Sequence, residues 1–200
     1  MTNFDERAKD WDADPMKVER ARIVADAIRS ALPLRPEMTA LEYGCGTGLL
    51  SFFLRTEFAS ITQADTSQGM LDVLSGKIKA AGVANMFPVR LDLGTDPLPV
   101  VRFHVLYSLM TLHHIPDTDG ILQKFQAVLE PGGWLALADL DREDGSFHCS
   151  EVTDVHHGFA REKLQAQVEA AGFRDVAFRT VFEIPKGGRV YPVFLMTARA

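Results

Sequence analysis

Thr39–Ser51, TALEYGCGTGLLS, is the stretch that decides the fold, because an apolar run breaks into alternating glycines and then becomes apolar again. This pattern predicts a buried strand, a tight turn and the start of a helix. Gly44, Gly46 and Gly48 lack the Cβ atoms that would hold a ligand away from the main chain, and they permit backbone angles closed to other residues. A ligand bound there would meet bare backbone N–H groups.

The turn differs from the dinucleotide-binding fingerprint G-x-G-x-x-G. Counted from Gly44, that fingerprint requires a third glycine at position 49, which is Leu49 in this chain. A pyrophosphate also requires a helix N-terminus directed at it. Here the carboxylate of Glu42 stands beside the glycines, which suits a ligand with a cationic end such as the ammonium group of an amino acid.

The run Glu42-Tyr-Gly44-Cys-Gly46-Thr-Gly48 resembles the E/D-x-G-x-G-x-G motif of the class I S-adenosylmethionine-dependent methyltransferases. The chain is most similar to the small, single-domain, ubiquinone-biosynthesis-type branch (methyltransferase domain 11-like), and the similarity continues over most of its length. The resemblance implies S-adenosylmethionine as the cofactor and S-adenosylhomocysteine as the product. It also implies a loop that holds the methionine part of the cofactor.

Ser60–Asp65, SITQAD, predicts a second strand that ends in a carboxylate 21 residues after Gly44. In a right-handed β-α-β unit the two strands lie side by side, so Asp65 is expected across a crevice from the glycines. A carboxylate there can accept hydrogen bonds from both ribose hydroxyls, although Asp is also a common helix cap. With the glycine turn in front of it, the ribose interpretation is favoured.

The third strand is expected over Met86–Leu93, ending at Asp92. Asp92 would accept a hydrogen bond from the adenine amine, and the backbone N–H of Leu93 would donate to a ring nitrogen. Met70 matches the methionine of the family's D-x-S-x-x-M pattern and is expected on the adenine face, in the core, or in both.

The fourth strand is expected over Arg102–Leu109. The family usually has an acid near the start of this strand, where this chain has His104, and the departure concerns strand packing more than cofactor contact. In related enzymes the tip around Ser108 and Leu109 lies near the methionine end of the cofactor. The cofactor-binding residues expected from all these matches are Glu42, Gly44, Cys45, Gly46, Gly48, Asp65, Thr66, Met70, Asp92, Leu93, Ser108 and Leu109.

Residues 112–115, L-H-H-I, also match the family. The preceding tetrapeptide SLMT is unlike the Asn-Pro-Pro-Tyr type that is common in enzymes that methylate the amino groups of adenine, cytosine or protein glutamine. A phenol or an enolisable carbon as acceptor would benefit from a general base. The candidates for this role are His113, His114, His156 and His157, of which the last two are alternatively solvated loop histidines.

No metal ion is expected at the site. Asp139, Asp141, His148, Asp154 and the histidines at 156 and 157 are acidic or imidazole side chains, but their spacing is not diagnostic of a metal site. Methyl transfer itself requires no metal.

The fold predicted from these elements is α/β, with a Rossmann-like, seven-stranded, mostly parallel sheet and helices on both faces. Pro131-Gly132-Gly133 predicts a turn before a fifth strand that begins at Trp134. Two extended runs joined across Pro185–Gly188 predict a C-terminal antiparallel hairpin, which the methyltransferase fold has and the dehydrogenase fold lacks. We expect a single domain over residues 1–200, with a helical lid over 1–33 and the core over 34–200.

Composition and charge limit the substrate and the location. The chain has 200 residues, 46% of them hydrophobic, and 21 basic against 27 acidic residues give a net charge of −6. This balance argues against a nucleic-acid acceptor, which usually leaves a basic footprint. The polar N-terminus predicts no signal peptide, and no apolar run is long enough to cross a membrane, so a cytoplasmic location is expected.

The predicted function is transfer of a methyl group from S-adenosylmethionine to a small-molecule acceptor by in-line displacement. Specificity would come from the N-terminal segment, the loop over residues 140–160 and, in a homodimer, a second copy of the chain. Two alternatives remain open at this point. One is a catalytically silent S-adenosylmethionine-binding module that regulates a partner, and the other is an NAD-dependent oxidoreductase.

Overall fold

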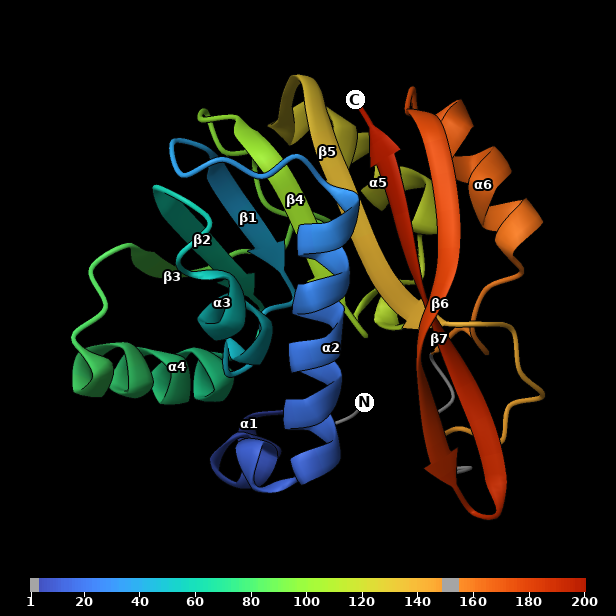
Figure 1. Ribbon diagram of the computed structural model, residues 1–200, viewed down its shortest axis with the longest axis horizontal. Coiled ribbons are helices and arrows are strands. Elements are labelled where there is room, and N and C mark those ends of the chain that lie inside the picture. The colour runs from blue at the N-terminus through green and yellow to red at the C-terminus, as the bar shows by residue number, and fades with distance from the viewer. Residues whose placement is uncertain (1–3, 149–154) are drawn as a thin grey trace.

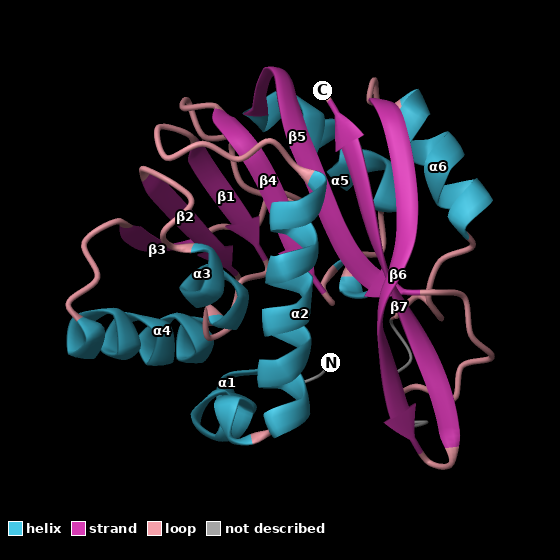
Figure 2. Cartoon of the chain, in the orientation of Figure 1, coloured by secondary structure: helices cyan, strands magenta, loops and turns pink. Residues whose placement is uncertain are grey.

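A computed structural model describes residues 4–148 and 155–200. Seven strands form one sheet in the order β3-β2-β1-β4-β5-β7-β6, and helices flank both of its faces (Figures 1 and 2). The strands are β1 (Thr39–Tyr43), β2 (Ser60–Asp65), β3 (Met86–Arg90), β4 (Phe103–Leu109), β5 (Leu129–Leu140), β6 (Arg174–Lys186) and β7 (Arg189–Arg199). The helices are α1 (Phe4–Arg7), α2 (Pro15–Ala31), α3 (Leu49–Leu54), α4 (Gln68–Ala81), α5 (Thr118–Val128) and α6 (Arg161–Ala170), with short 3-10 turns η1 (Ala8–Ala13) and η2 (Leu112–His114).

The predicted sheet is confirmed. Strands β3, β2, β1, β4 and β5 are parallel, and β7 runs antiparallel between β5 and β6. Residues Trp134 to Leu140 of β5 pair with residues Val193 to Arg199 of β7. Consequently β6 reaches the rest of the sheet only through β7.

Side-chain caps explain where two of the longer helices begin. Asp14 accepts a hydrogen bond from the backbone N of Met16 at 2.9 Å, and Pro15 occupies the first helical position of α2, where its missing N–H costs nothing. Ser67 caps α4 in the same way through the backbone N of Met70, and α4 ends at Gly82 in the left-handed conformation.

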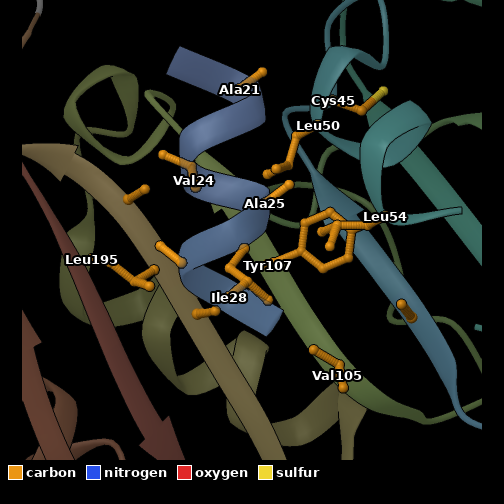
Figure 3. Close-up of a cluster of buried hydrophobic side chains, with 14 of the residues drawn as sticks. Ala21, Val24, Ala25, Ile28, Cys45, Leu50, Leu54, Val105, Tyr107 and Leu195 are labelled. Carbon is orange, nitrogen blue, oxygen red and sulfur yellow. The ribbon is translucent and has the colours of Figure 1, made fainter. Parts of the chain in front are cut away.

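The sheet separates two apolar cores. One core lies under α2, α3 and α4, and the other lies under α5 and α6. Figure 3 shows how α2 contributes to the first core: Ala21, Val24, Ala25 and Ile28 lie on the side of the helix that faces the sheet, opposite Tyr107. Because these four helix residues are buried, α2 packs as part of the core.

Two local predictions were wrong. Pro131-Gly132-Gly133 was expected to be a turn before the fifth strand, but these residues lie inside β5, which already pairs with β4 at Leu129. The register shifts between Phe103 and Val105 of β4, so the glycines form an irregularity in the ladder. Pro185 likewise lies within β6, and the hairpin turn is confined to Gly187 and Gly188.

The face of β3 opposite α4 is uncovered in the described part of the chain, because residues 91–102 connect β3 to β4 without a helix. Phe87 and Val89 are 53% and 38% exposed, whereas Met86, on the other face, is buried. The alternation is that of a strand with one packed face. None of the described helices is both long and apolar enough to cross a membrane.

Candidate active site

The three glycines of the loop after β1 are all left-handed, with φ of 70° at Gly44, 53° at Gly46 and 76° at Gly48. A Cβ on Gly44 would come within 2.2 Å of Thr111, and one on Gly48 within 2.5 Å of Leu74. These two glycines are therefore required by packing within the protein as well as by backbone conformation.

Gly46 differs from the other two, because a Cβ there would meet only the sulfur of Met70, at 3.9 Å. The space above it is open. Met70 itself is 2% exposed, so its side chain is packed beneath the loop. At Gly46 the half-buried backbone lies beside space that none of the described side chains fills. Such a position can accommodate a ligand close to the main chain.

Asp65 joins this loop to the end of β2. Its Oδ2 accepts a hydrogen bond from the backbone N of Gly46 at 2.7 Å, and its Oδ1 accepts one from Ser67 at 2.9 Å. Burial raises the pKa of the Asp65 carboxyl, and the backbone hydrogen bonds oppose that shift. The backbone N–H groups of Gly44 and Cys45 both donate to the carbonyl of Ala64, which fixes the two strand ends together. The juxtaposition of Asp65 with the glycines that was predicted from spacing is present.

Glu42 lies at the predicted strand end but is buried, with 2% exposure. Ser51 of α3 donates a hydrogen bond to its carboxyl, and the Ser51 hydroxyl also lies 2.7 Å from the hydroxyl of Tyr107. Burial raises the pKa of Glu42 to about 8, against which the hydrogen bonds from Ser51 act. Without a ligand, Glu42 is therefore predominantly neutral at pH 7 rather than an exposed carboxylate.

Asp92 and Leu93 follow β3 rather than ending it, since the strand stops at Arg90. The Tyr43 hydroxyl bridges the two: it lies 3.4 Å from Asp92 Oδ1, and the backbone N of Leu93 donates to it at 3.2 Å. The predicted donor to an adenine nitrogen is thus paired with Tyr43 in this structure. A cavity of about 380 Å³ opens here, lined by Thr66, Arg90, Asp92, Thr95 and Asp96.

The tip of β4 packs directly on the glycine loop. The Ser108 hydroxyl donates to the carbonyl of Tyr43 at 2.6 Å, and the Thr111 hydroxyl lies 3.2 Å from the carbonyls of Gly44 and Leu109. Met110 between them has a φ of 56°, which is strained for a residue with a side chain. The predicted residues Ser108 and Leu109 therefore lie beside the loop.

Three histidines gather at the ends of β4 and β5, and we call His113, His114 and His148 the histidine cluster. Their ring centroids are 4.1 Å apart for His113 and His114, 5.1 Å for His113 and His148, and 5.6 Å for His114 and His148. Burial, with repulsion from the neighbouring imidazoles, lowers the pKa of His114 to about 3 and that of His148 to about 4. Both rings are neutral at pH 7.

Asp139 holds His113 in place. Its Oδ1 lies 2.6 Å from Nδ1 of His113, and its two oxygens also accept hydrogen bonds from the backbone N atoms of His113 and Leu140. Burial opposes ionisation of this carboxyl, but His113 and these hydrogen bonds outweigh it and hold the pKa of Asp139 below its usual value. The ring orientation leaves Nε2 of His113 as the nitrogen free for other partners.

His156 and His157 are not part of the histidine cluster. Nε2 of His156 lies 2.9 Å from the carbonyl of Ile115, and its backbone N donates to the carbonyl of His113, so His156 supports η2. His157 is exposed and lies against Gly145. Both line a separate cavity of about 410 Å³ beside α6. The structure thus brings His113 and His114 together and leaves the other two candidates outside, while Asp154 lies outside the described residues.

Residues 4–13, which we call the N-terminal segment, lie against α4, the glycine loop and the histidine cluster. Asp12 accepts hydrogen bonds from the Thr47 hydroxyl in the glycine loop and from Lys77 of α4, both at 2.5 Å. The ring of Phe4 contacts that of Trp11, with a centroid distance of 6.1 Å, and that of His114, at 5.3 Å. The segment therefore touches both the glycine loop and the histidine cluster.

Four polar residues of the candidate site were not given a role in binding or positioning by the sequence pattern. Arg20 Nε, both amide atoms of Gln63 and Nδ1 of His148 are buried without a hydrogen-bond partner among the described residues. Asp139 was noted only as an acid without diagnostic spacing. The available signal for Asp139 and Gln63 was a polar residue inside an apolar strand, which is uncommon unless it has a partner.

A family model described as a methyltransferase domain matches residues 16–177. Among curated relatives, an uncharacterized methyltransferase of Schizosaccharomyces pombe is 32% identical over 136 residues, covering 60% of this chain and 48% of its own. The 27-O-demethylrifamycin SV methyltransferase of Amycolatopsis mediterranei is 30% identical over 132 residues, which cover 64% of this chain and 48% of the relative. A ubiquinone biosynthesis O-methyltransferase of Marinobacter nauticus is 30% identical over 110 residues, which cover 54% of this chain and 46% of the relative. The chain spans about half the length of these relatives.

Two solved structures share the fold. The methyltransferase partner in a complex with the Trm112 activator of Haloferax volcanii has a TM-score of 0.79 at 16% identity, with 98% of this chain and 97% of that chain covered. Phosphoethanolamine N-methyltransferase 2 of Haemonchus contortus, in complex with S-adenosylmethionine, has a TM-score of 0.74 at 16% identity, with 88% and 51% covered.

Proposed function

Because the chain belongs to the class I S-adenosylmethionine-dependent methyltransferases, we propose that it transfers a methyl group from this cofactor to a small-molecule acceptor. The observation that carries the proposal is the hydrogen bond that the backbone N of Gly46 donates to the Asp65 carboxyl, beside space that none of the described side chains fills. The family expected from the sequence is confirmed, and with it S-adenosylmethionine as the cofactor. The alternative of an NAD-dependent oxidoreductase is therefore dropped.

The residues present fit this cofactor. Gly46 offers a bare backbone beside unfilled space, Asp65 offers a carboxylate for two vicinal hydroxyls, and a cavity of about 380 Å³ continues toward Asp92. Both contacts that Asp92 makes with Tyr43 and Gly94 fall on Oδ1, so its other oxygen is available to an amine. This supports the order of methionine part, ribose and adenine along β1, β2 and β3.

The methionine part is a zwitterion, and two buried groups beside α2 and α3 suit its two charges. A cationic ammonium group would favour ionisation of Glu42, whose pKa burial raises to about 8. Arg20 of α2, whose Nε is buried without a hydrogen-bond partner in the described part of the chain, is the corresponding candidate for the carboxylate. Gly44, Cys45, Gly48, Ser108 and Leu109 would complete the contacts to this part, and Thr66, Met70 and Leu93 those to the nucleoside.

The N-terminal segment is proposed to be the lid, with its boundary near residue 13 rather than at residue 33, because α2 is packed into the core. Its contacts to Thr47 and His114 span the cofactor loop and the histidine cluster. When bound, S-adenosylmethionine supplies a methyl carbon already activated by its positive sulfur. The work left to the chain is to exclude water and hold the acceptor in line with that carbon.

The acceptor is proposed to lie against His113 and His114, at the carboxyl ends of β4 and β5. Asp139 fixes one nitrogen of His113 and thereby directs the other to the acceptor. His156 is proposed as a positioning residue for η2, and His157 as a wall of the neighbouring cavity. The acceptors named for the relatives above, a rifamycin and phosphoethanolamine, are small molecules, which supports the same class here. A cytoplasmic location, the absence of a nucleic-acid acceptor and a homodimer remain predictions.

The proposal is tested in two steps. Isothermal titration with S-adenosylmethionine should give one site per chain, and Asp65→Ala should abolish it while circular dichroism shows an unchanged fold. Release of S-adenosylhomocysteine is then measured with a panel of phenols, amines and enolisable ketones. Turnover with at least one acceptor is expected. Unchanged affinity in Asp65→Ala refutes the site, and binding without turnover on any acceptor supports the silent-module alternative instead.

A further inference from the structure

We propose that the histidine cluster is a binding site for one divalent transition-metal ion of the zinc class. The ligand nitrogens of His113, His114 and His148 lie within 4.8 Å of one another. In a tetrahedral zinc site, bonds of about 2.0–2.1 Å place neighbouring nitrogens about 3.3 Å apart. Small rotations of the three side chains therefore bring them to coordination distance.

The ring of His113 is already oriented as a metal-bound imidazole is. Asp139 lies 2.6 Å from its Nδ1 and is itself anchored by the backbone N of Leu140 at 2.7 Å. A carboxylate that binds one nitrogen of a histidine fixes the tautomer and presents the other nitrogen to the metal. His113 and Asp139 are 2% and 1% exposed, so this pair is rigidly held in the interior.

His148 supplies an independent observation that points to a ligand. Its Nδ1 is buried and has no hydrogen-bond partner within residues 4–148 and 155–200. A buried polar atom without a partner is costly and uncommon in native structures. A metal bond to this nitrogen would remove the cost. The neighbouring Glu143, whose Oε1 is also buried and has no partner among the described residues, adds negative charge to the same loop.

The donor set decides the kind of metal. Three neutral imidazoles favour zinc, copper, nickel or cobalt, whereas magnesium and calcium require oxygen ligands. Three protein ligands also leave a coordination position open, as in catalytic rather than structural zinc sites. The sequence predicted no metal here because His148 is 34 residues from His114, and only the folded chain brings it to η2.

The consequence for catalysis rests on the proposed function. An acceptor oxygen bound at the open position would lose its proton to water more readily, because a metal ion lowers the pKa of a bound hydroxyl. The acceptor would then be an oxygen nucleophile, such as a phenol or an enol. Nε2 of His113 would hold the metal instead of taking the proton.

The test uses the full chain without a histidine tag, dialysed against a chelator and titrated calorimetrically with ZnCl₂. One equivalent is expected to bind. His148→Ala should weaken binding by at least 100-fold, and Asp139→Asn should weaken it by about 10- to 100-fold, the usual effect of removing a group that orients a ligand. His157→Ala is the matched control, an exposed histidine outside the cluster, and should bind as the wild type does.

Absorption of the Co²⁺-loaded protein supplies a second readout, because intense visible bands report a tetrahedral, protein-bound metal ion rather than the hexaaquo ion. No bound zinc in the wild type, or equal affinity in His148→Ala, overturns the site. Equal losses in His148→Ala and His157→Ala do so as well. Binding of S-adenosylmethionine is measured in the same samples, so that zinc binding without cofactor binding refutes the proposed function alone, and the reverse result refutes the metal site alone.

Discussion

Of the three loop glycines, Gly46 is the one at which a new Cβ would not collide with the protein, so its substitution tests the loop's contact with a ligand. We expect Gly46→Ala to fold, at a cost of about 1–2 kcal/mol for an alanine in the left-handed conformation. It should nevertheless bind S-adenosylmethionine at least 100-fold more weakly, since the methyl group would occupy the ligand's place. Titration calorimetry measures the affinity, and thermal unfolding measures the stability.

Gly82 is the matched control for this variant. It has a φ of 62°, against 53° at Gly46, and a Cβ there would meet none of the described residues within 4 Å. Gly82→Ala should therefore lose similar stability and keep full affinity. If the two variants bind equally well, the loop does not contact the cofactor.

Glu42 predicts a dependence of stability on pH. Its pKa is 4.5 in the unfolded reference state and about 8 in the folded protein, chiefly because burial disfavours the charged form. Below pH 4.5 the Glu42 carboxyl is protonated in both the folded and the unfolded state, so it does not change the free energy of unfolding with pH. Between pH 4.5 and pH 8 only the unfolded state releases the proton, so the free energy of unfolding falls as pH rises, by up to about 1.4 kcal/mol per pH unit.

Glu42→Gln removes the titration while keeping a hydrogen-bonding side chain of the same size. Urea unfolding at several pH values between 5 and 8 should give a shallower slope for the variant than for the wild type. Parallel curves for the two proteins would contradict a raised pKa at Glu42.

Whether a contact between two residues could be predicted depended on how far apart the residues lie in the sequence. The position of Asp65 beside the glycine loop was predicted correctly, because Asp65 ends a strand at a fixed offset from Gly44. The pairing of Leu93 with Tyr43, 50 residues apart, and that of His113 with Asp139, 26 residues apart, depend on the register of strands and on side-chain rotation. Neither is encoded in a local pattern.

Among the elements, the N-terminal segment is proposed to be a lid, and substitution of Asp12 tests that role. Its contacts with Thr47 and Lys77 are between partly exposed groups, and such pairs contribute up to about 1 kcal/mol. We expect Asp12→Ala to weaken cofactor binding by about fivefold, because the segment is then held less firmly over the glycine loop. Stability should change little.

Asp26→Ala is the control, since Asp26 forms comparable ion pairs with Arg22 and Arg29 on the outer side of α2. It should leave cofactor affinity unchanged. An equal loss in both variants would mean that the effect of Asp12 is one of general stability rather than of contact with the loop.

The element boundaries show where turn signals mislead. Pro131-Gly132-Gly133 has the composition of a turn, yet a bulge in a paired strand also accommodates a glycine with positive φ, and Gly132 has a φ of 80°. Composition cannot distinguish the two, because the difference is whether β4 lies alongside.

For the whole molecule, the sheet and its single antiparallel strand were predictable, since strand order follows from handedness and from the terminal hairpin. Residues 91–102 join β3 to β4 without a helix, and this explains why Phe87 and Val89 are exposed. The division of the interior into two cores follows from helices on both faces.

The position of β7 has a consequence for biosynthesis. A ribosome produces β5 and then β6 before it produces the strand that lies between them, and β6 has no other neighbour in the sheet. The sheet therefore cannot be completed until residues 189–199 emerge, and until then the edges of β5 and β6 that pair with β7 remain unpaired and open to chaperones or to misassociation.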